Sequence, residues 1–312
     1  MKKITLSINP TYFCNFRCDF CYLTKEQLGD KKTLRLEDLK CRLRELQSYG
    51  YQVDHVDLYG GEIALLGDSY LDELDKILED HGDPSIAINT NYSRVIPYFL
   101  KEHVDLSVSF DFEARQSSDI VLQNIMGTPK EVAILVLASP EVLKMDIDLM
   151  IRTFNHISNI KTVEIKPYST NQANQLAVTF KEYEDFVRGW IESPIPKRFV
   201  FENENLIQES LFGTRNAFSD DHLYITPEGK FAVLEFDEND HEFFLSLDSV
   251  SDYELWSEEE KKNVLSNSVC EKCEYKGVCL TEHYRVVTND GPSCSGFKGL
   301  LDWSRESSQF QN

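Results

Sequence analysis

The chain has 312 residues, the length of one large globular domain or of two with about 150 residues each. Hydrophobic types make up 41% of it, enough for a sizeable core, so the composition excludes wholesale disorder. Lysine and arginine number 32 against 53 aspartates and glutamates, and the resulting formal charge of −21 argues against general binding to nucleic acids or membrane surfaces.

The sequence shows neither a membrane span nor an export signal. Its longest apolar run, 132–138, falls far short of the roughly 20 residues that a spanning helix needs. The N-terminus alternates like a strand and lacks an apolar signal core. We therefore expect a cytoplasmic protein whose eight cysteines stay reduced. Three of them lie at 14–21 and four at 270–294, which predicts two metal centres, while Cys41 stands alone.

The first half of the chain alternates short apolar runs with amphipathic, charged stretches. These patterns predict strands at 4–8, 55–59, 85–89, 105–110, 132–138 and 162–165, and helices at 36–49, 70–81, 94–102, 119–126 and 146–156. Such alternation is typical of βαβ units, so the predicted class is α/β with a parallel sheet or partial barrel. In these folds the chemistry lies at the carboxyl ends of the strands.

The alternation stops near residue 168. A polar loop, a helix at 180–191 and an irregular connector to 221 are predicted next. From His222 the pattern indicates a hairpin that turns at Pro227-Glu228-Gly229. The expected organisation is a partial barrel at 1–190, a connector at 191–221 and a small cysteine-containing domain at 222–312.

The first cysteine cluster follows the first predicted strand directly. Cys14, Cys18 and Cys21 form a C-x3-C-x-aromatic-C loop, with Phe20 as the aromatic residue. Three thiolates on so short a loop can hold three irons of a cubane cluster and leave the fourth iron without a protein ligand. Structural zinc is the alternative, but its usual spacing is C-x2-C with a fourth ligand, which no nearby residue supplies.

This loop resembles the signature of the radical S-adenosylmethionine (SAM) enzymes. The resemblance implies a partial (β/α)6 barrel and a 4Fe–4S cluster on the three cysteines, with SAM chelating the fourth iron. It further implies that one electron cleaves SAM to methionine and a 5′-deoxyadenosyl radical, which abstracts hydrogen from a substrate. The electron would come from a flavodoxin- or ferredoxin-type donor.

Further residues fall where the resemblance requires cofactor contacts. Gly60, Gly61 and Glu62 look like the family's Gly-Gly-Glu motif, followed here by Ile63 in place of the common proline. Glycines permit close backbone approach to the ligand, and Glu62 can accept from the SAM ammonium group. The next two strands add the polar candidates Asn89, Ser109 and Asp111. Asp111 is either a SAM contact or a general base for a substrate proton; each of these polar residues can also be an ordinary strand-end residue.

The second cluster is a C-x2-C-x5-C run at Cys270, Cys273 and Cys279, closed by Cys294. Spacing alone leaves a structural zinc site open. The tail resembles a shortened SPASM domain, the cluster module of radical SAM peptide maturases, and lacks that module's proximal ligands, with His283 at one of the positions. The resemblance implies an auxiliary 4Fe–4S cluster ligated fully by the four cysteines and suited to electron transfer.

A SPASM-type tail implies a peptide or protein substrate, most often a ribosomally made precursor peptide that docks directly or through a separate leader-binding protein. A fully ligated auxiliary cluster favours oxidative cross-linking, for example a cyclophane-type carbon–carbon bond. Epimerisation, thioether formation and protein maturation remain alternatives. A catalytically inactive, metal-stabilised peptide-binding protein is the alternative from a different class.

Overall fold

The computed structural model describes residues 1–168, 173, 176–218, 220–234, 244–266, 268–280, 294, 296–307 and 310. The strands are β1 (Lys2–Ile8), β2 (Tyr51–Leu58), β3 (Ser85–Thr90), β4 (Val104–Ser109), β5 (Val132–Leu137), β6 (Ile160–Lys166), β7 (Val200–Phe201), β8 (His222–Ile225), β9 (Phe231–Leu234) and β10 (Phe244–Leu247). The α-helices are α1 (Lys25–Gly29), α2 (Leu36–Ser48), α3 (Asp68–Asp80), α4 (Ser118–Gly127), α5 (Ile147–Asn155), α6 (Phe180–Glu192), α7 (Glu202–Phe212), α8 (Val250–Ser266) and α9 (Lys298–Glu306). Short 3₁₀ turns lie at Ile63–Leu65, Pro97–Leu100, Phe112–Ala114 and Val142–Lys144.

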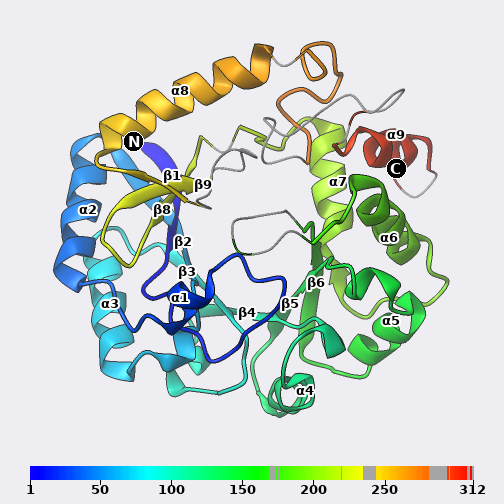
Figure 1. The fold of residues 1–312 in the computed structure, drawn as a ribbon, viewed down its shortest axis with the longest axis horizontal. Helices are drawn as coiled ribbons and strands as arrows, with labels where there is room; N and C mark the ends of the chain where they lie inside the picture. The colour runs from blue at the N-terminus through cyan, green and yellow to red at the C-terminus, as the bar shows by residue number, and fades with distance from the viewer. Residues whose placement is uncertain are drawn as a thin grey trace.

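The strands just given form one ten-stranded sheet in the order β10-β9-β8-β1-β2-β3-β4-β5-β6-β7. Strands β1 to β7 run parallel, and β8 adds to β1 in parallel at the other side. Strands β9 and β10 complete that edge in antiparallel pairing. Figure 1 shows the sheet curving around the centre of the molecule with α2 to α6 on its outside. The predicted α/β class with a parallel, barrel-like sheet is confirmed. None of the helices described is long and apolar enough to cross a membrane.

The two faces of the sheet differ in chemistry because side chains alternate along each strand. Leu6 and Val56 are paired in register and fully buried in the main core, on the face that the helices cover. Ser7 and Asp57 are the next pair along and point to the inner, concave face. The inner face therefore carries polar side chains along β1 and β2, and the loop that leaves the carboxyl end of β1 carries the first cysteine set.

The helix predicted at 94–102 is wrong. That segment holds a single 3₁₀ turn, Pro97–Leu100. Pro97 occupies the first position of the turn, while Tyr98 and Phe99 are both buried. Ile96, the residue before Pro97, is extended (φ −121°, ψ 153°), as the residue before a proline prefers, so an α-helix cannot run through this segment.

The connector predicted at 191–221 is more regular than expected, because it contains β7 and α7. The buried face of α7 includes Asn203, Ile207 and Ser210, and its two polar members hide the apolar spacing. The Asn203 side chain has a structural partner: it accepts from the Ile165 backbone N–H (2.8 Å) and donates to its carbonyl (2.9 Å). It thereby pairs with a backbone donor and a backbone acceptor of β6, as a neighbouring strand would.

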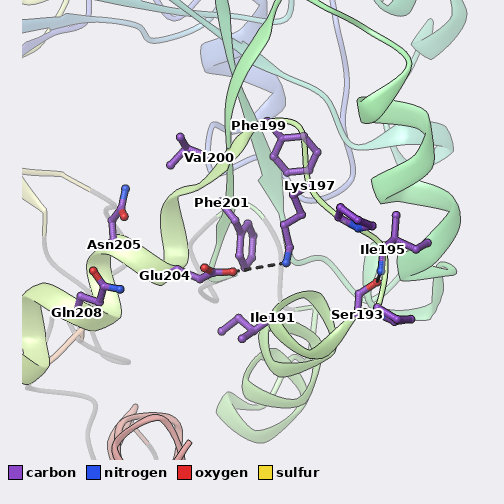
Figure 2. Close-up of a pocket in the computed structure, with 12 residues that line it drawn as sticks. Ile191, Ser193, Ile195, Lys197, Phe199, Val200, Phe201, Glu204, Asn205 and Gln208 are labelled. Atoms are coloured by element: carbon purple, nitrogen blue, oxygen red, sulfur yellow. Dashed lines mark hydrogen bonds and ion pairs between the residues drawn. The ribbon is translucent and has the colours of Figure 1, made fainter. Parts of the chain in front are cut away.

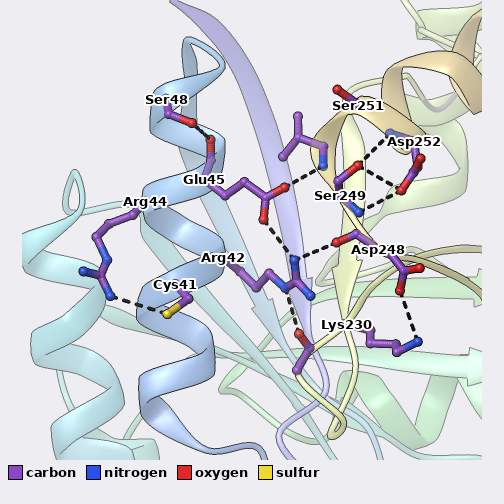
Figure 3. Close-up of polar contacts among 12 residues, drawn as sticks. Cys41, Arg42, Arg44, Glu45, Ser48, Lys230, Asp248, Ser249, Ser251 and Asp252 are labelled. Carbon is purple, nitrogen blue, oxygen red and sulfur yellow. Dashed lines mark hydrogen bonds and ion pairs between the residues drawn. The ribbon is translucent and has the colours of Figure 1, made fainter.

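The predicted hairpin is confirmed as β8 and β9, with Gly229 at φ +74° in the turn. Arg42 on α2 fastens this hairpin to the barrel: its guanidinium donates to the carbonyls of Gly229 (2.8 Å) and Asp248 (2.9 Å) and lies 4.8 Å from the Phe231 ring centre. Figure 3 shows the hydrogen bonds of Arg42 beside the start of α8. The sheet thus continues past residue 222, where the sequence suggested a separate domain, and the three domain ranges stay predictions.

Candidate metal centres

The first cysteine set lies on the loop that leaves β1 at the carboxyl edge of the sheet. Cys14 is buried, and Cys18 and Cys21 are half-buried. The Cys14 N–H donates to the Leu28 carbonyl (3.2 Å), and the Arg17 guanidinium donates to the Cys14 carbonyl (2.7 Å), which fixes the loop. Burial raises the pKa of each thiol, and a neighbouring thiol of the set raises it further. The three sulfurs are therefore close enough to interact.

The two glycines after β2 are required by the cysteine loop itself. A Cβ on Gly60 would lie 2.4 Å from the Thr11 carbonyl oxygen, and one on Gly61 would lie 2.2 Å from that of Phe13. Gly60 also has a φ of +142°, and the Gly61 N–H donates to Thr11 (2.8 Å). The sequence analysis explained these glycines by the close approach of a ligand to the backbone. The structure adds a second reason, because the backbone of the cysteine loop already lies against them.

Glu62 is fully buried at the same edge and is surrounded by donors. Its Oε1 accepts from the Thr90 hydroxyl (2.6 Å) and the Ala64 N–H (2.8 Å), while Oε2 accepts from the Asn91 N–H (2.8 Å). Burial raises the pKa of Glu62, and these hydrogen bonds act in the opposite direction. The carboxylate thus joins the ends of β2 and β3, and any contact with a cofactor would add to this bracing role.

Asp111, the predicted general base or SAM contact, is fully buried and paired. Its Oδ1 accepts from the Leu137 N–H (2.5 Å), and its Oδ2 accepts from Arg115 Nε (2.7 Å). Arg115 also donates to Cys18 Sγ (3.7 Å), and its guanidinium lies 5.1 Å from the centre of the Phe20 ring. The structure therefore brings three predicted site residues together through an arginine that the sequence analysis did not identify.

Asn89 and Ser109 lie on the inner face of the sheet, as the strand alternation predicts. Asn89 pairs with Ser107 between β3 and β4, and Ser109 pairs with Leu135 between β4 and β5. Both side chains are half-buried near the carboxyl ends of their strands. They are therefore positioned on the concave surface beneath the cysteine loop, and their assignment to SAM remains a proposal.

The second cysteine set lies between α8 and α9. Cys270 and Cys279 are buried, whereas Cys273 and Cys294 are half-buried. Burial raises the pKa of Cys270 to about 11, and the other three thiols of the set contribute to the rise. Tyr275 connects this segment to α9 through its hydroxyl. The four thiols are thus neighbours, although Cys294 is far along the chain; His283 and residues 235–243 of the hairpin lie outside the described residues.

Cys14 has hydrogen-bond donors at its sulfur: the Phe16 N–H (3.4 Å) and Asn91 Nδ2 (3.8 Å) both donate to Cys14 Sγ. Donors of this kind accompany the ligand sulfurs of iron–sulfur clusters and tune their potentials. Among the described residues, which include all seven of these cysteines, no group of three or more Cys, His, Asp or Glu side chains is placed to hold one metal ion.

The residue missed by sequence reasoning is Arg115. It follows Asp111 by four positions, a spacing typical of a local ion pair, but its sulfur partner Cys18 is 97 residues away. A long-range contact of this kind leaves no local pattern. It becomes visible only when β4 and β1 are brought into the same sheet.

A cavity of about 540 Å³ lies at the far edge of the sheet, near β7. Figure 2 shows it between the end of α6 and α7, with Lys197 and Glu204 paired across it (3.5 Å) and Phe201 beside them. Its lining includes no residue of either cysteine set. We therefore do not assign it to the metal chemistry.

Residues 8–137 match the family model described as the Radical SAM superfamily. This segment contains the first cysteine set, the Gly60–Glu62 turn and Asp111. This matched segment, which holds the first cysteine loop and strands β2 to β5, is therefore similar to radical SAM domains. A comparison with curated protein sequences finds no match.

Solved structures with the same fold include radical SAM proteins with bound SAM and peptide. Native anSMEcpe with bound AdoMet and Cp18Cys peptide has a TM-score of 0.70 at 13% identity, covering 97% of each chain. SuiB from Streptococcus suis bound to S-adenosylmethionine has a TM-score of 0.63 at 16% identity, covering 89% of this chain and 72% of SuiB. SuiB bound to precursor peptide SuiA gives a TM-score of 0.60 at 17% identity over 89% of this chain and 71% of that one. At these identities the likeness shows the fold alone, and the chain shares its fold with anSMEcpe and SuiB.

Proposed function

We propose that this protein is a radical SAM peptide maturase that oxidatively cross-links a ribosomally synthesised precursor peptide. The observation that carries the proposal is the cysteine loop at the carboxyl edge of β1, with Cys14, Cys18 and Cys21 as neighbours and with donors aimed at their sulfurs. A 4Fe–4S cluster with SAM on that loop would supply a 5′-deoxyadenosyl radical. The inner face of the sheet carries polar side chains such as Asn89 and Ser109, which could contact a peptide chain.

The residues around the loop position the cofactors in this proposal. Glu62 and its donors fix the turn after β2 against the loop, which keeps the SAM side of the site rigid. Asn89 and Ser109 supply polar groups on the inner face beside it. The hydrogen bonds of Asp111 favour a role in holding Arg115 over one in accepting a substrate proton.

Peptide substrates are supported by the neighbours, since SuiB was solved with its precursor peptide and anSMEcpe with a peptide. Cross-linking is the finer part of the proposal. Joining two residues removes two hydrogens from the peptide: one leaves as an atom, the other as a proton and an electron. An auxiliary cluster held by the second cysteine set would accept that electron. Its ligands would be Cys270, Cys273, Cys279 and Cys294.

The decisive first experiment measures iron and sulfide after anaerobic reconstitution, in wild type and in a Cys14/Cys18/Cys21→Ala variant. We expect about eight irons per chain to fall to about four, one cubane lost and one retained. About four irons falling to none, with one zinc retained, would make the tail a structural zinc site. The electron-acceptor role and the preference for cross-linking would then be withdrawn.

The reaction itself is tested on the reduced holoenzyme with SAM and a candidate precursor peptide. We expect 5′-deoxyadenosine and a peptide that has lost two hydrogen atoms, with the new bond located by fragmentation. A product of unchanged mass with an inverted residue would replace cross-linking by epimerisation. Absence of SAM cleavage in protein with full iron content would favour the inactive peptide-binding alternative.

A further inference from the structure

A half-buried arginine contacts the cysteine loop from the side of β4. The Arg115 side chain is 15% exposed, and its Nη1 donates to Cys18 Sγ at 3.7 Å. We propose that Arg115, held in place by Asp111, is a positioning residue that raises the reduction potential of the cluster on the Cys14–Cys21 loop. The inference rests on the cluster proposed above and concerns this chain's own residues around it.

The geometry of the guanidinium makes the sulfur contact specific. Nε and Nη2 both point to Asp111 Oδ2, at 2.7 and 2.6 Å, which leaves Nη1 for the sulfur. Asp111 is itself fixed by the Leu137 N–H on β5 and is fully buried. The Phe20 ring packs against the guanidinium at 5.1 Å. Only a planar fork can make these contacts together, so lysine is not an equivalent residue here.

The charges around Cys18 determine the sign of the effect. Reduction adds one negative charge to a cluster, and a cation donating to a ligand sulfur stabilises that reduced state. Asp111 opposes this, but Arg115 lies between it and Cys18, so the positive end of the pair faces the sulfur.

Arg115 is a charged donor to a sulfur of the loop, which distinguishes it from the donors to Cys14. Cys14 Sγ receives neutral donors, the Phe16 N–H and the Asn91 amide. Arg17 is a second cation on the loop, but its guanidinium donates to backbone carbonyls, those of Cys14 and Phe16 at 2.7 Å among them. Arg17 therefore provides a matched control, because it is a cation of the same loop whose guanidinium donates to backbone carbonyl oxygens.

The test is an EPR-monitored potentiometric measurement on reconstituted full-length protein without SAM. The relevant signal is the one that the Cys14/Cys18/Cys21→Ala variant lacks. Wild type, R115M, R115K and R17M are compared at equal iron content per chain. We expect the midpoint potential to be lowest in R115M, intermediate in R115K, and closer to wild type in R17M.

A wild-type potential in R115M, or an equal shift in R17M, would overturn the inference. If R115M retains no iron, R115K decides: a lower potential than wild type supports the sulfur hydrogen bond, and an unchanged one refutes it. These outcomes leave the proposed function standing, because the cluster is still present. Wild-type protein without iron at the first set would remove both proposals.

Discussion

Gly61 is the position where one added methyl group should disturb both folding and cluster assembly. In Gly61→Ala the new Cβ would lie 2.2 Å from the Phe13 carbonyl oxygen and 2.4 Å from that of Tyr12. Both contacts are to backbone oxygens, which cannot move away by a side-chain rotation. The backbone of the cysteine loop therefore has to shift by about 1 Å in a packed interior. Overpacking of this kind costs about 1–3 kcal/mol, and weakening of the Gly61 N–H bond to Thr11 adds about 1 kcal/mol.

We therefore expect Gly61→Ala to lower the free energy of unfolding by about 2–4 kcal/mol and to reduce the iron bound at the first cysteine set. Urea denaturation of the anaerobic apoprotein measures the first effect, and iron analysis after reconstitution measures the second. Gly127→Ala is the control: nothing lies within 4 Å of its Cβ position in α4, so it should stabilise by up to about 1 kcal/mol. Unchanged stability and iron content in Gly61→Ala would refute the steric argument.

Three further predictions follow from polar contacts. Thr90→Val removes a donor to the buried Glu62 carboxylate and should cost about 1–3 kcal/mol in urea unfolding; no loss would mean that this hydrogen bond is unimportant. Arg42→Met should cost about 2 kcal/mol and expose the β8–β9 hairpin to proteolysis, whereas an equally resistant hairpin would contradict its fastening role. A hydrogen bond to Asp57 raises the pKa of His55 in the folded protein. The stabilisation from this pair should therefore be complete below about pH 6.5, the ordinary histidine pKa, and be lost as the pH rises through the raised pKa of His55. Proton NMR should show that pKa falling in Asp57→Asn, and an unshifted His55 would exclude the pair.

The sequence predicted the sheet well because its signal is local. Each core strand is a short apolar run, and each end of a run is followed by the residues that now lie at one edge, as with Gly60 and Asp111. The failures have equally local causes. Pro97 limits a predicted helix to one turn, and the buried Asn203 and Ser210 interrupt the apolar spacing of α7.

The sequence predicted which residues form the candidate site, but not the hydrogen-bond partners of their side chains. Cysteine spacing identified the loop, yet the three donors around Glu62 come from the 3₁₀ turn Ile63–Leu65 and from the end of β3. The pairing of Asp111 with Arg115 could be suspected from their spacing, whereas the contact to Cys18 depends on the parallel order of β1 to β4. Such contacts are set by topology, which a local sequence pattern does not encode.

The parallel pairing of β1 with β8 has a consequence for how the protein is made. Thr5 pairs with His222, so the first strand to be synthesised gains its second neighbour 217 residues later. At about 5–20 residues per second, translation leaves that edge of β1 unpaired for roughly 10–45 s. An open strand edge is a site of wrong pairing with other chains. We therefore expect fragments that end before β8 to aggregate, and the nascent chain to depend on whatever covers β1 until the hairpin arrives.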